Sequence, residues 1–410
     1  MKTITFFLAV SLLYLTFCSP TPELPFEDRL QSVLDREIRA SDTKGVSAAV
    51  LFPGETIWTG TSGISHDTVA ISPDMLFAIG SITKNMVAAL TLKLVEAHLL
   101  SLDDPLSKWL PAYPHVDSTI TIRQLLNHTS GLYMFWENQQ IWDDLKKDRA
   151  KVWTPEEVLS YIKAPYFTPG DGWRYSNTNY LLLAMIINRV TGSSLSSEFK
   201  QHFWQPLGID DMFLSQEEVI PPNQAHVYGD NFQFGSGTRD VTFLPRASHE
   251  SITYGSSGIF TSAASLARWS QALFGGRVLQ LQSLKSMLQF VEFNPVANMR
   301  AYGLGVQVYT RSFASGKYAI GHGGGNIGTT TYMVYLPEYQ TSIVVMVNAF
   351  PNHSVDVITK GLIRTVLSEQ GAIGFIPYFE FFPTGLMISC FCVSLITVVI
   401  VYMRKRKRRP

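Results

Sequence analysis

Residues 77–100 read FAIGSITKNMVAALTLKLVEAHLL: a short apolar run breaks at Gly80, and after Ser81 comes a segment that is apolar almost all the way round a helix, with residues such as Met86, Leu90 and Leu94. A helix without a polar face is a buried helix. The pattern therefore predicts that Ser81 lies at the N-terminal end of a helix that is buried in the core. Lys84 follows three residues later, on the same helical face and within reach of the serine.

This spacing suits nucleophilic catalysis. A serine hydroxyl is a poor nucleophile until a neighbouring base takes its proton, and a lysine amine can be that base once it is neutral. Burial and the positive end of a helix dipole both lower a lysine pKa, and the helix tip offers N–H groups to an oxyanion. Ser-x-x-Lys is a weak pattern, however, because three further copies begin at Ser41, Ser160 and Ser197. A structural serine therefore remains an alternative.

Composition narrows the possible functions. The formal net charge is zero, but residues 404–409 carry six of the 33 basic side chains and Lys2 carries another. The remainder has 26 basic against 33 acidic side chains, a net charge of about −7, which argues against a nucleic-acid partner. All three cysteines, Cys18, Cys390 and Cys392, lie in terminal apolar stretches, which excludes a cysteine metal site in the body. The nine histidines form no convincing ligand cluster, so neither a metal nor a cofactor is expected.

Both ends of the chain resemble targeting segments. Residues 1–18 combine Lys2 with an apolar run, as a secretory signal peptide does, although an uncleaved anchor is an alternative. Residues 384–403 form an uncharged run of 20 residues, long enough for a transmembrane helix, and the basic tail 404–410 follows directly. An aromatic linker, 371–383, precedes this run, and the positive-inside rule puts the tail in the cytoplasm. The expected protein is a single-pass type I protein of the cell membrane with residues 26–370 outside the cell.

Strand patterns lie at both ends of this extracellular domain, and helical patterns lie between them. The expected strands cover residues 46–52, 56–59, 303–310, 317–321, 329–336 and 341–349. Residues 30–38 and 355–367 have helical spacing. The simplest assembly is an α/β (α+β) fold, an antiparallel sheet flanked by the terminal helices with a mainly helical region inserted. A site is expected between the two regions, where pockets commonly form.

A second candidate segment is the Pro/Gly-rich loop 167–180, which contains Tyr175-Ser-Asn177. A phenol close to an ammonium ion loses its proton more easily and can relay protons to a leaving group. The Asn177 amide can hold a substrate carbonyl or amide. The alternative is a packed loop tyrosine, with Asn177 capping the next helix.

A third candidate segment, residues 320–328, reads IGHGGGNIG. Gly323, Gly324 and Gly325 would let a ligand approach the backbone, and their N–H groups could pair with a substrate or complete an oxyanion hole. His322 could donate a hydrogen bond or shuttle a proton. A glycine-rich hairpin with a structural histidine is the alternative.

In their order and separation, the motifs Ser81-Ile-Thr-Lys84, Tyr175-Ser-Asn177 and His322-Gly-Gly-Gly325 resemble those of the serine β-lactamase and penicillin-binding protein superfamily. The likeness is to its class C β-lactamase, D-Ala-D-Ala carboxypeptidase and esterase branch. The phrases LLNHTSGL at 125–132 and SGIFTSAASLAR at 257–268 agree with it. The resemblance runs from about residue 26 to 367 and implies a β-lactamase/transpeptidase-like fold.

The resemblance also implies roles for individual residues. Ser81 would be the acylated nucleophile, Lys84 its proton acceptor and Tyr175 a general base or acid. Asn177 would orient the substrate, and the backbone N–H groups of Ser81 and Gly325 would form the oxyanion hole.

The third motif departs from the family pattern. His322 and Gly323 stand where the family most often has the lysine and threonine of Lys-Thr-Gly, which help to hold the carboxylate of penicillins and peptides. Compared with that lysine and threonine, His322 and Gly323 supply less positive charge and no hydroxyl group. The expected activity is therefore hydrolysis of a small-molecule or peptide ester or amide, with weak or no β-lactamase activity.

Two functions remain open from the sequence. One is a membrane-anchored extracellular serine hydrolase that works through a Ser81 acyl-enzyme. The other is a catalytically inactive β-lactamase-like surface or extracellular-matrix protein with a binding or structural role.

Asn352 and Asn127 match glycosylation acceptors, and Asn352 is the better candidate because Asn127 lies within a phrase expected to be packed. The sequence carries no signal for the oligomeric state.

Overall fold

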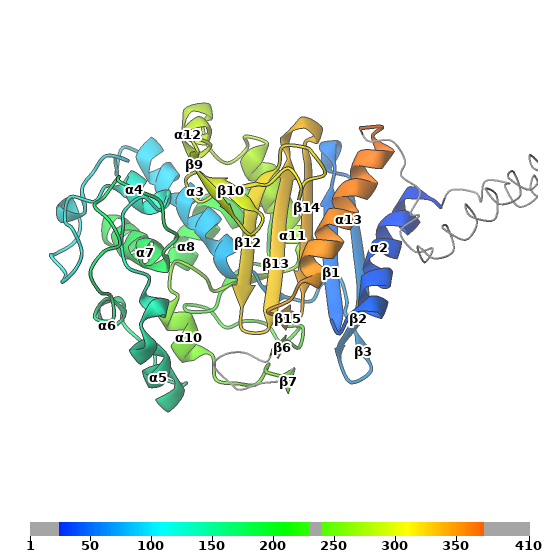
Figure 1. Ribbon diagram of the computed structural model, residues 1–410, viewed down its shortest axis with the longest axis horizontal. Coiled ribbons are helices and arrows are strands. Elements are labelled where there is room, and N and C mark those ends of the chain that lie inside the picture. Colours follow the sequence, from blue (N-terminus) through cyan, green and yellow to red (C-terminus); the bar gives the residue numbers. More distant parts are fainter. Residues whose placement is uncertain (1–23, 230–238, 373–410) are drawn as a thin grey trace, which may run out of the picture. The chain divides into compact units, whose positions relative to one another are not determined.

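The computed structural model describes residues 24–229 and 239–372 (Figure 1). The predicted signal peptide, transmembrane helix and basic tail, and the linker from residue 373, lie outside the described residues. Within the described ranges no helix combines the length and apolar character needed to cross a membrane. The chain divides into two compact units after Thr365, inside the last helix, and the strands and the candidate site belong to the first unit.

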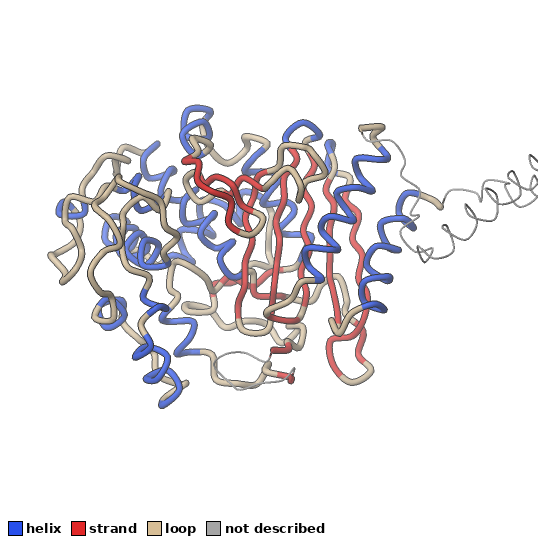
Figure 2. Tube along the Cα trace, in the orientation of Figure 1, coloured by secondary structure: helices blue, strands red, loops and turns tan. Residues whose placement is uncertain are grey.

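Within the described residues, a nine-stranded antiparallel sheet has the order β3-β2-β1-β14-β13-β12-β11-β10-β9. Figure 2 shows its long strands side by side, in red. The N-terminal part supplies β1 (Gly45–Leu51), β2 (Ile57–His66) and β3 (Val69–Ala70). The C-terminal part supplies β9 (Val291–Val296), β10 (Met299–Tyr302), β11 (Gln307–Tyr309), β12 (Ile320–Asn326), β13 (Thr329–Leu336) and β14 (Thr341–Val347). β1 lies between β2 and β14, with Val46 opposite Val347. The predicted sheet, built from both ends of the body, is confirmed.

Helices cover both faces of this sheet (Figure 1). α2 (Phe26–Ala40) and, as far as Thr365, α13 (Ser354–Glu369) lie over one face, and α11 (Ala263–Phe274) lies over the other. Every residue of β1 and of β14 is buried, as expected for strands covered on both sides.

A mainly helical region is inserted between the two halves of the sheet, as predicted. Its helices are α3 (Thr83–Glu96), α4 (Ile122–Leu126), α5 (Gln139–Lys147), α6 (Pro155–Leu159), α7 (Asn177–Thr191), α8 (Leu195–Phe199), α9 (Gln205–Leu207), α10 (Ala247–Ile252) and α12 (Leu281–Met287). Two small sheets join it to the rest: β4 (Phe77–Ala78), β8 (Ile259–Thr261) and β5 (Phe213–Leu214) form one, and β15 (Ala349–Phe350), β6 (Tyr228–Gly229) and β7 (Arg239–Asp240) form the other.

α3 is the buried helix that residues 77–100 predict. Eleven of its 14 residues are buried, so it presents no polar face to solvent. Its one buried amide is satisfied: Asn85 donates to the Gly305 carbonyl at 3.0 Å and accepts from Trp269 Nε1 at 2.9 Å. A 3-10 turn, Gly80–Ile82, precedes it, so Ser81 lies just before the regular helix and not within it.

Several predicted strands have different bounds: the strand expected over 56–59 runs to His66 in β2, and of the strand expected over 303–310 only β11 forms. The strand expected over 317–321 begins at Ile320 and continues through all three glycines to Asn326. Its pairing with β13 runs from Ile320 opposite Tyr335 to Asn326 opposite Thr329. Glycine has a low β propensity, and the strand forms here because a long neighbouring strand supplies its hydrogen bonds.

Candidate active site

Close backbone contact brings Ser81 beside β12. A Cβ on Gly324 would lie 2.0 Å from the Ile79 carbonyl oxygen, and a Cβ on Gly80 would lie 2.4 Å from the Gly325 carbonyl oxygen. Gly80 also has φ = +53°, which disfavours other residues. These glycines therefore let the Ser81 turn and the strand meet backbone to backbone.

Lys84 reaches back to Ser81 from the first turn of α3. Its Nζ lies 2.9 Å from Ser81 Oγ and donates a hydrogen bond to the Ser256 carbonyl at 2.8 Å. The side chain is fully buried, and this burial lowers the pKa of Lys84 well below 10.5. A neutral amine at this position has a lone pair that can accept the Ser81 proton.

Tyr175 lies against the same pair. Lys84 Nζ is 4.9 Å from the centroid of its ring, and the Tyr175 side chain is hydrogen-bonded to Ser81. Burial raises the pKa of Tyr175 above its usual value of 10, and the bond with Ser81 offsets only part of that rise. The predicted lowering by a neighbouring ammonium ion is therefore corrected, because desolvation of the buried phenol is the dominant effect on its pKa. In this geometry Tyr175 is a protonated phenol that can donate a proton.

Asn177 is the first residue of α7 and is buried. The helix is capped at Ser176 without a side-chain hydrogen bond, so the capping role considered for Asn177 does not apply. Its Oδ1 is buried and has no hydrogen-bond partner among the described residues. A buried amide oxygen without a partner is costly, and a ligand N–H group would satisfy it.

His322 lies on β12, next to the three glycines, and its side chain is directed into the protein. Its side chain is fully buried, with Nδ1 2.6 Å from the Gly323 carbonyl oxygen and Nε2 2.9 Å from Tyr302 Oη. Burial, with a smaller contribution from Lys84, lowers the pKa of His322 to about 3, so the ring is neutral. The neighbouring Gly323 N–H donates to Gln307 Oε1 at 2.9 Å. The polar groups of His322 and Gly323 thus bind the protein in this structure, and their contact with substrate stays a prediction.

A cavity of about 230 Å³ opens beside Ser81. Asn177, Ser256 and Gly325 also line it, so the structure gathers residues from all three predicted segments at one place. Within the described ranges no cluster of three or more histidine, cysteine, aspartate or glutamate side chains could hold a metal ion.

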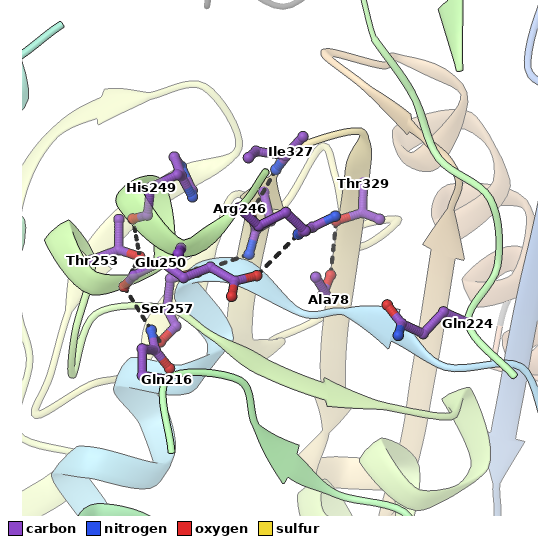
Figure 3. Close-up of polar contacts among 12 residues, drawn as sticks. Ala78, Gln216, Gln224, Arg246, His249, Glu250, Thr253, Ser257, Ile327 and Thr329 are labelled. Atoms are coloured by element: carbon purple, nitrogen blue, oxygen red, sulfur yellow. Dashed lines mark hydrogen bonds and ion pairs between the residues drawn. The ribbon is translucent and has the colours of Figure 1, made fainter. Parts of the chain in front are cut away.

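Polar contacts on one side of the cavity hold α10 and the segment after it (Figure 3). Gln216 Nε2 donates to the carbonyl oxygens of Glu250 and Ser257, at 2.9 and 3.2 Å. Asn326 Nδ2 donates to Ser257 Oγ at 3.2 Å. These contacts fix the segment whose Ser256 carbonyl holds Lys84.

Sequence reasoning assigned no role to His128, which supports the Tyr175 loop. Its Nδ1 accepts from the Ser176 N–H at 3.2 Å and lies 3.0 Å from Asn179 Nδ2, and its ring is 4.3 Å from that of Tyr175. The signal in the sequence that could have identified His128 was the phrase LLNHTSGL at 125–132, in which it lies next to Asn127.

The side-chain amides of both glycosylation candidates form hydrogen bonds within the protein. Asn127 is buried, and its Oδ1 accepts from the Thr129 hydroxyl at 2.7 Å. Asn352 donates to Thr43 Oγ1 at 2.9 Å and accepts from the Ser354 N–H at 2.7 Å. Glycosylation stays a prediction at both positions.

The family model described as Beta-lactamase matches residues 30–367, most of the chain. The chain belongs to the Beta-lactamase family. The predicted membership of the serine β-lactamase and penicillin-binding protein superfamily is therefore confirmed.

Three similar proteins illustrate the breadth of this family. Penicillin-binding protein 4* of Bacillus subtilis (strain 168) is 28% identical over 292 residues, which cover 68% of this chain and 62% of that protein, less than two thirds of its length. Esterase EstB of Burkholderia gladioli is 32% identical over 276 residues, which cover 60% of this chain and 69% of the esterase. The D-amino acid amidase from Ochrobactrum anthropi SV3, complexed with L-phenylalanine, superposes with a TM-score of 0.74 at 26% identity, covering 85% of this chain and 99% of the amidase. That likeness confirms the predicted fold of this Beta-lactamase family member.

Proposed function

We propose that this protein is a serine hydrolase that cleaves an ester or an amide through an acyl-enzyme on Ser81. The observation that carries the proposal is the 2.9 Å separation of Ser81 Oγ from the buried amine of Lys84, at the edge of a cavity. Relatives named as an esterase and a D-aminopeptidase, and the D-amino acid amidase structure, support this class of reaction.

The geometry suggests one sequence of steps. Ser81 Oγ attacks the substrate carbonyl carbon while the neutral Lys84 amine takes its proton, and the Ser256 carbonyl stabilises the ammonium ion that forms. The oxyanion accepts hydrogen bonds from the N–H groups of Ser81 and Gly325. Tyr175 then protonates the leaving group as the carbonyl–heteroatom bond breaks, and the Lys84 ammonium ion, which lies beside the Tyr175 ring, returns a proton to the phenolate. Water hydrolyses the resulting Ser81 ester.

β-Lactamase activity is proposed to be weak or absent. Among the described residues that line the cavity there is no lysine or arginine, and the imidazole of His322 is buried and neutral. A penicillin carboxylate placed there would lose its water without gaining a cation.

A fluorophosphonate probe tests the acyl-enzyme proposal. We expect the probe to label the purified protein on Ser81, as located by mass spectrometry, and Ser81→Ala to remove the label. Ser197→Ala, which changes an exposed serine in another Ser-x-x-Lys copy, serves as the control and keeps it. If the folded wild-type protein stays unlabelled, the hydrolase proposal is wrong and the non-catalytic surface role gains support.

We also propose that the hydrolase domain is held outside the cell by a membrane anchor. The support is the uncharged run 384–403 followed by the basic tail 404–410. Deletion of residues 384–410 is expected to move the protein from the membrane fraction to the medium of expressing cells. A truncated chain that stays an integral membrane protein would contradict the anchor.

A further inference from the structure

We propose that the cavity beside Ser81 holds the acyl part of the substrate and favours an uncharged acyl group that carries an aromatic ring. This inference rests on the proposed hydrolase function and adds a substrate class to it. Three observations support it: the opening of the cavity at Ser81, the rings along its wall, and the uncharged character of its described lining.

The first observation is the position of the cavity. A leaving group takes its proton from Tyr175 and must therefore leave on the side of Ser81 that faces Tyr175 and Lys84. Neither of these residues lines the cavity, whereas Asn177 and Gly325 do. The cavity therefore opens directly at Ser81, beside Asn177 and Gly325, where it can receive the acyl chain. Asn177 lines the cavity, and its buried Oδ1 has no partner among the described residues.

The second observation is an aromatic wall formed by Trp136, Trp142 and His249, all of which line the cavity. The two indole rings are stacked with centroids 4.3 Å apart, and the His249 ring is nearly parallel to Trp136 at 5.6 Å. Trp142 Nε1 donates to the Trp136 carbonyl at 2.8 Å, which fixes the indole of Trp142. Ile327 and Phe350 add further apolar lining. Flat aromatic groups gain from stacking on such rings beyond the gain from burial alone.

The size of the cavity is consistent with a small acyl group. Its volume of about 230 Å³ falls below the range of roughly 300–1,000 Å³ that is usual for drug-sized ligands. A single ring on a short chain is therefore the preferred occupant, and a long peptide is not.

The third observation is electrostatic. In the part of the chain that the structure describes, no aspartate, glutamate, lysine or arginine lines the cavity. Burial, together with the nearby Arg246, lowers the pKa of His249 to about 3, so this ring is neutral at neutral pH. Arg246 itself is paired with Glu250 at 3.0 Å (Figure 3). A carboxylate or ammonium group on the acyl chain would thus be desolvated without a counterion.

The test is a panel of p-nitrophenyl esters with acetyl, 3-phenylpropionyl, 3-cyclohexylpropionyl and succinyl groups. One leaving group is common to all four, so differences in kcat/KM report the acyl side. We expect the phenylpropionyl ester to exceed the acetyl ester by about 10- to 100-fold and the cyclohexyl ester by about 3- to 10-fold. The succinyl ester is expected at or below the acetyl ester. Equal rates for the phenyl and cyclohexyl esters, or a succinyl rate that matches the phenylpropionyl rate, would overturn the inference.

Variants test whether the aromatic wall produces the preference. Trp142→Ala is expected to bring the phenyl-to-cyclohexyl ratio close to one, and Trp142→Phe, which restores a ring, to retain most of the ratio. Trp58→Ala, on β2 and outside the cavity lining, removes a half-buried tryptophan as the matched control and keeps the ratio. A ratio unchanged in Trp142→Ala would contradict the assignment. If Trp142→Ala does not fold, His249→Leu is expected to lower the same ratio.

The panel also separates the two proposals. If no ester, including the acetyl ester, is turned over by the wild-type protein, the hydrolase function itself fails. If the acetyl ester is turned over in a Ser81-dependent way without any preference for the aromatic group, only the acyl-site inference fails.

Discussion

Lys84→Met is expected to lower the rate of Ser81 acylation by about 10²- to 10⁴-fold, the contribution typical of a positioned acid–base group. Methionine nearly matches the length of lysine but has no amine to accept the serine proton. The pre-steady-state release of p-nitrophenol from an ester measures this step directly. Lys285→Met, at an exposed lysine of α12, is the control and keeps the rate. Acylation at the wild-type rate in Lys84→Met would exclude the amine as the base.

The same variant tests whether the amine is held neutral. The Lys84 amine loses its proton well below pH 10.5 in the folded chain and near pH 10.5 in the unfolded chain. Between these two values the unfolded chain binds one more proton, so the free energy of unfolding rises with pH by about 1.4 kcal/mol per pH unit. Above the pKa of Lys84 in the unfolded chain, the free energy of unfolding no longer rises for this reason. Lys84→Met has no amine at this position and therefore lacks this pH dependence.

Urea unfolding at pH 7, 8 and 9 measures this effect as the difference between the wild type and Lys84→Met. We expect the free energy of unfolding of the wild type to increase relative to that of Lys84→Met as the pH rises. Parallel pH profiles for the two proteins would show that Lys84 is charged in the folded chain, and the proposed base would then be wrong.

Gly324→Ala is expected to lower kcat by about 10²- to 10³-fold, the cost typical of losing an oxyanion-hole donor. The added Cβ would lie 2.0 Å from the Ile79 carbonyl oxygen and 3.1 Å from the Ser81 nitrogen. β12 and the Ser81 turn would have to separate, which pulls the N–H groups of Ser81 and Gly325 apart.

The neighbouring Gly323→Ala is the matched comparison. The three atoms nearest to a Cβ there all belong to side chains, the closest in the Tyr332 ring at 2.9 Å, so the expected loss of kcat is smaller. Ester turnover measures both variants, and circular dichroism with thermal unfolding shows that each is folded. A folded Gly324→Ala with wild-type kcat would refute the oxyanion hole between the turn and the strand.

Local signals in the sequence predicted much of this fold. The buried helix α3 follows from a run without a polar face, and β13 has the predicted bounds, 329–336. The proximity of Ser81 and Lys84 follows from helical spacing alone, since three residues separate them. These features depend on neighbours in the chain and can therefore be recognised without the fold.

The features that were missed depend on distant partners. The glycines of β12 form a strand because β13 pairs with them, although glycine itself has a low β propensity. The direction of His322 is set by Tyr302, 20 residues away in the sequence. The aromatic wall joins Trp136 and Trp142 to His249, which lies more than 100 residues further along the chain, and no spacing rule connects them.

The position of β1 between β2 and β14 has a consequence for synthesis. Gly45 donates to Asn348 Oδ1 at 2.7 Å across a separation of 303 residues. At translation rates of about 5–20 residues per second, β1 leaves the ribosome roughly 15–60 s before this partner exists. Throughout that interval an apolar strand has an unpaired edge, which is a template for aggregation. The nascent chain is therefore expected to depend on chaperones until β14 has been translated, and a premature stop before residue 341 to yield an insoluble product.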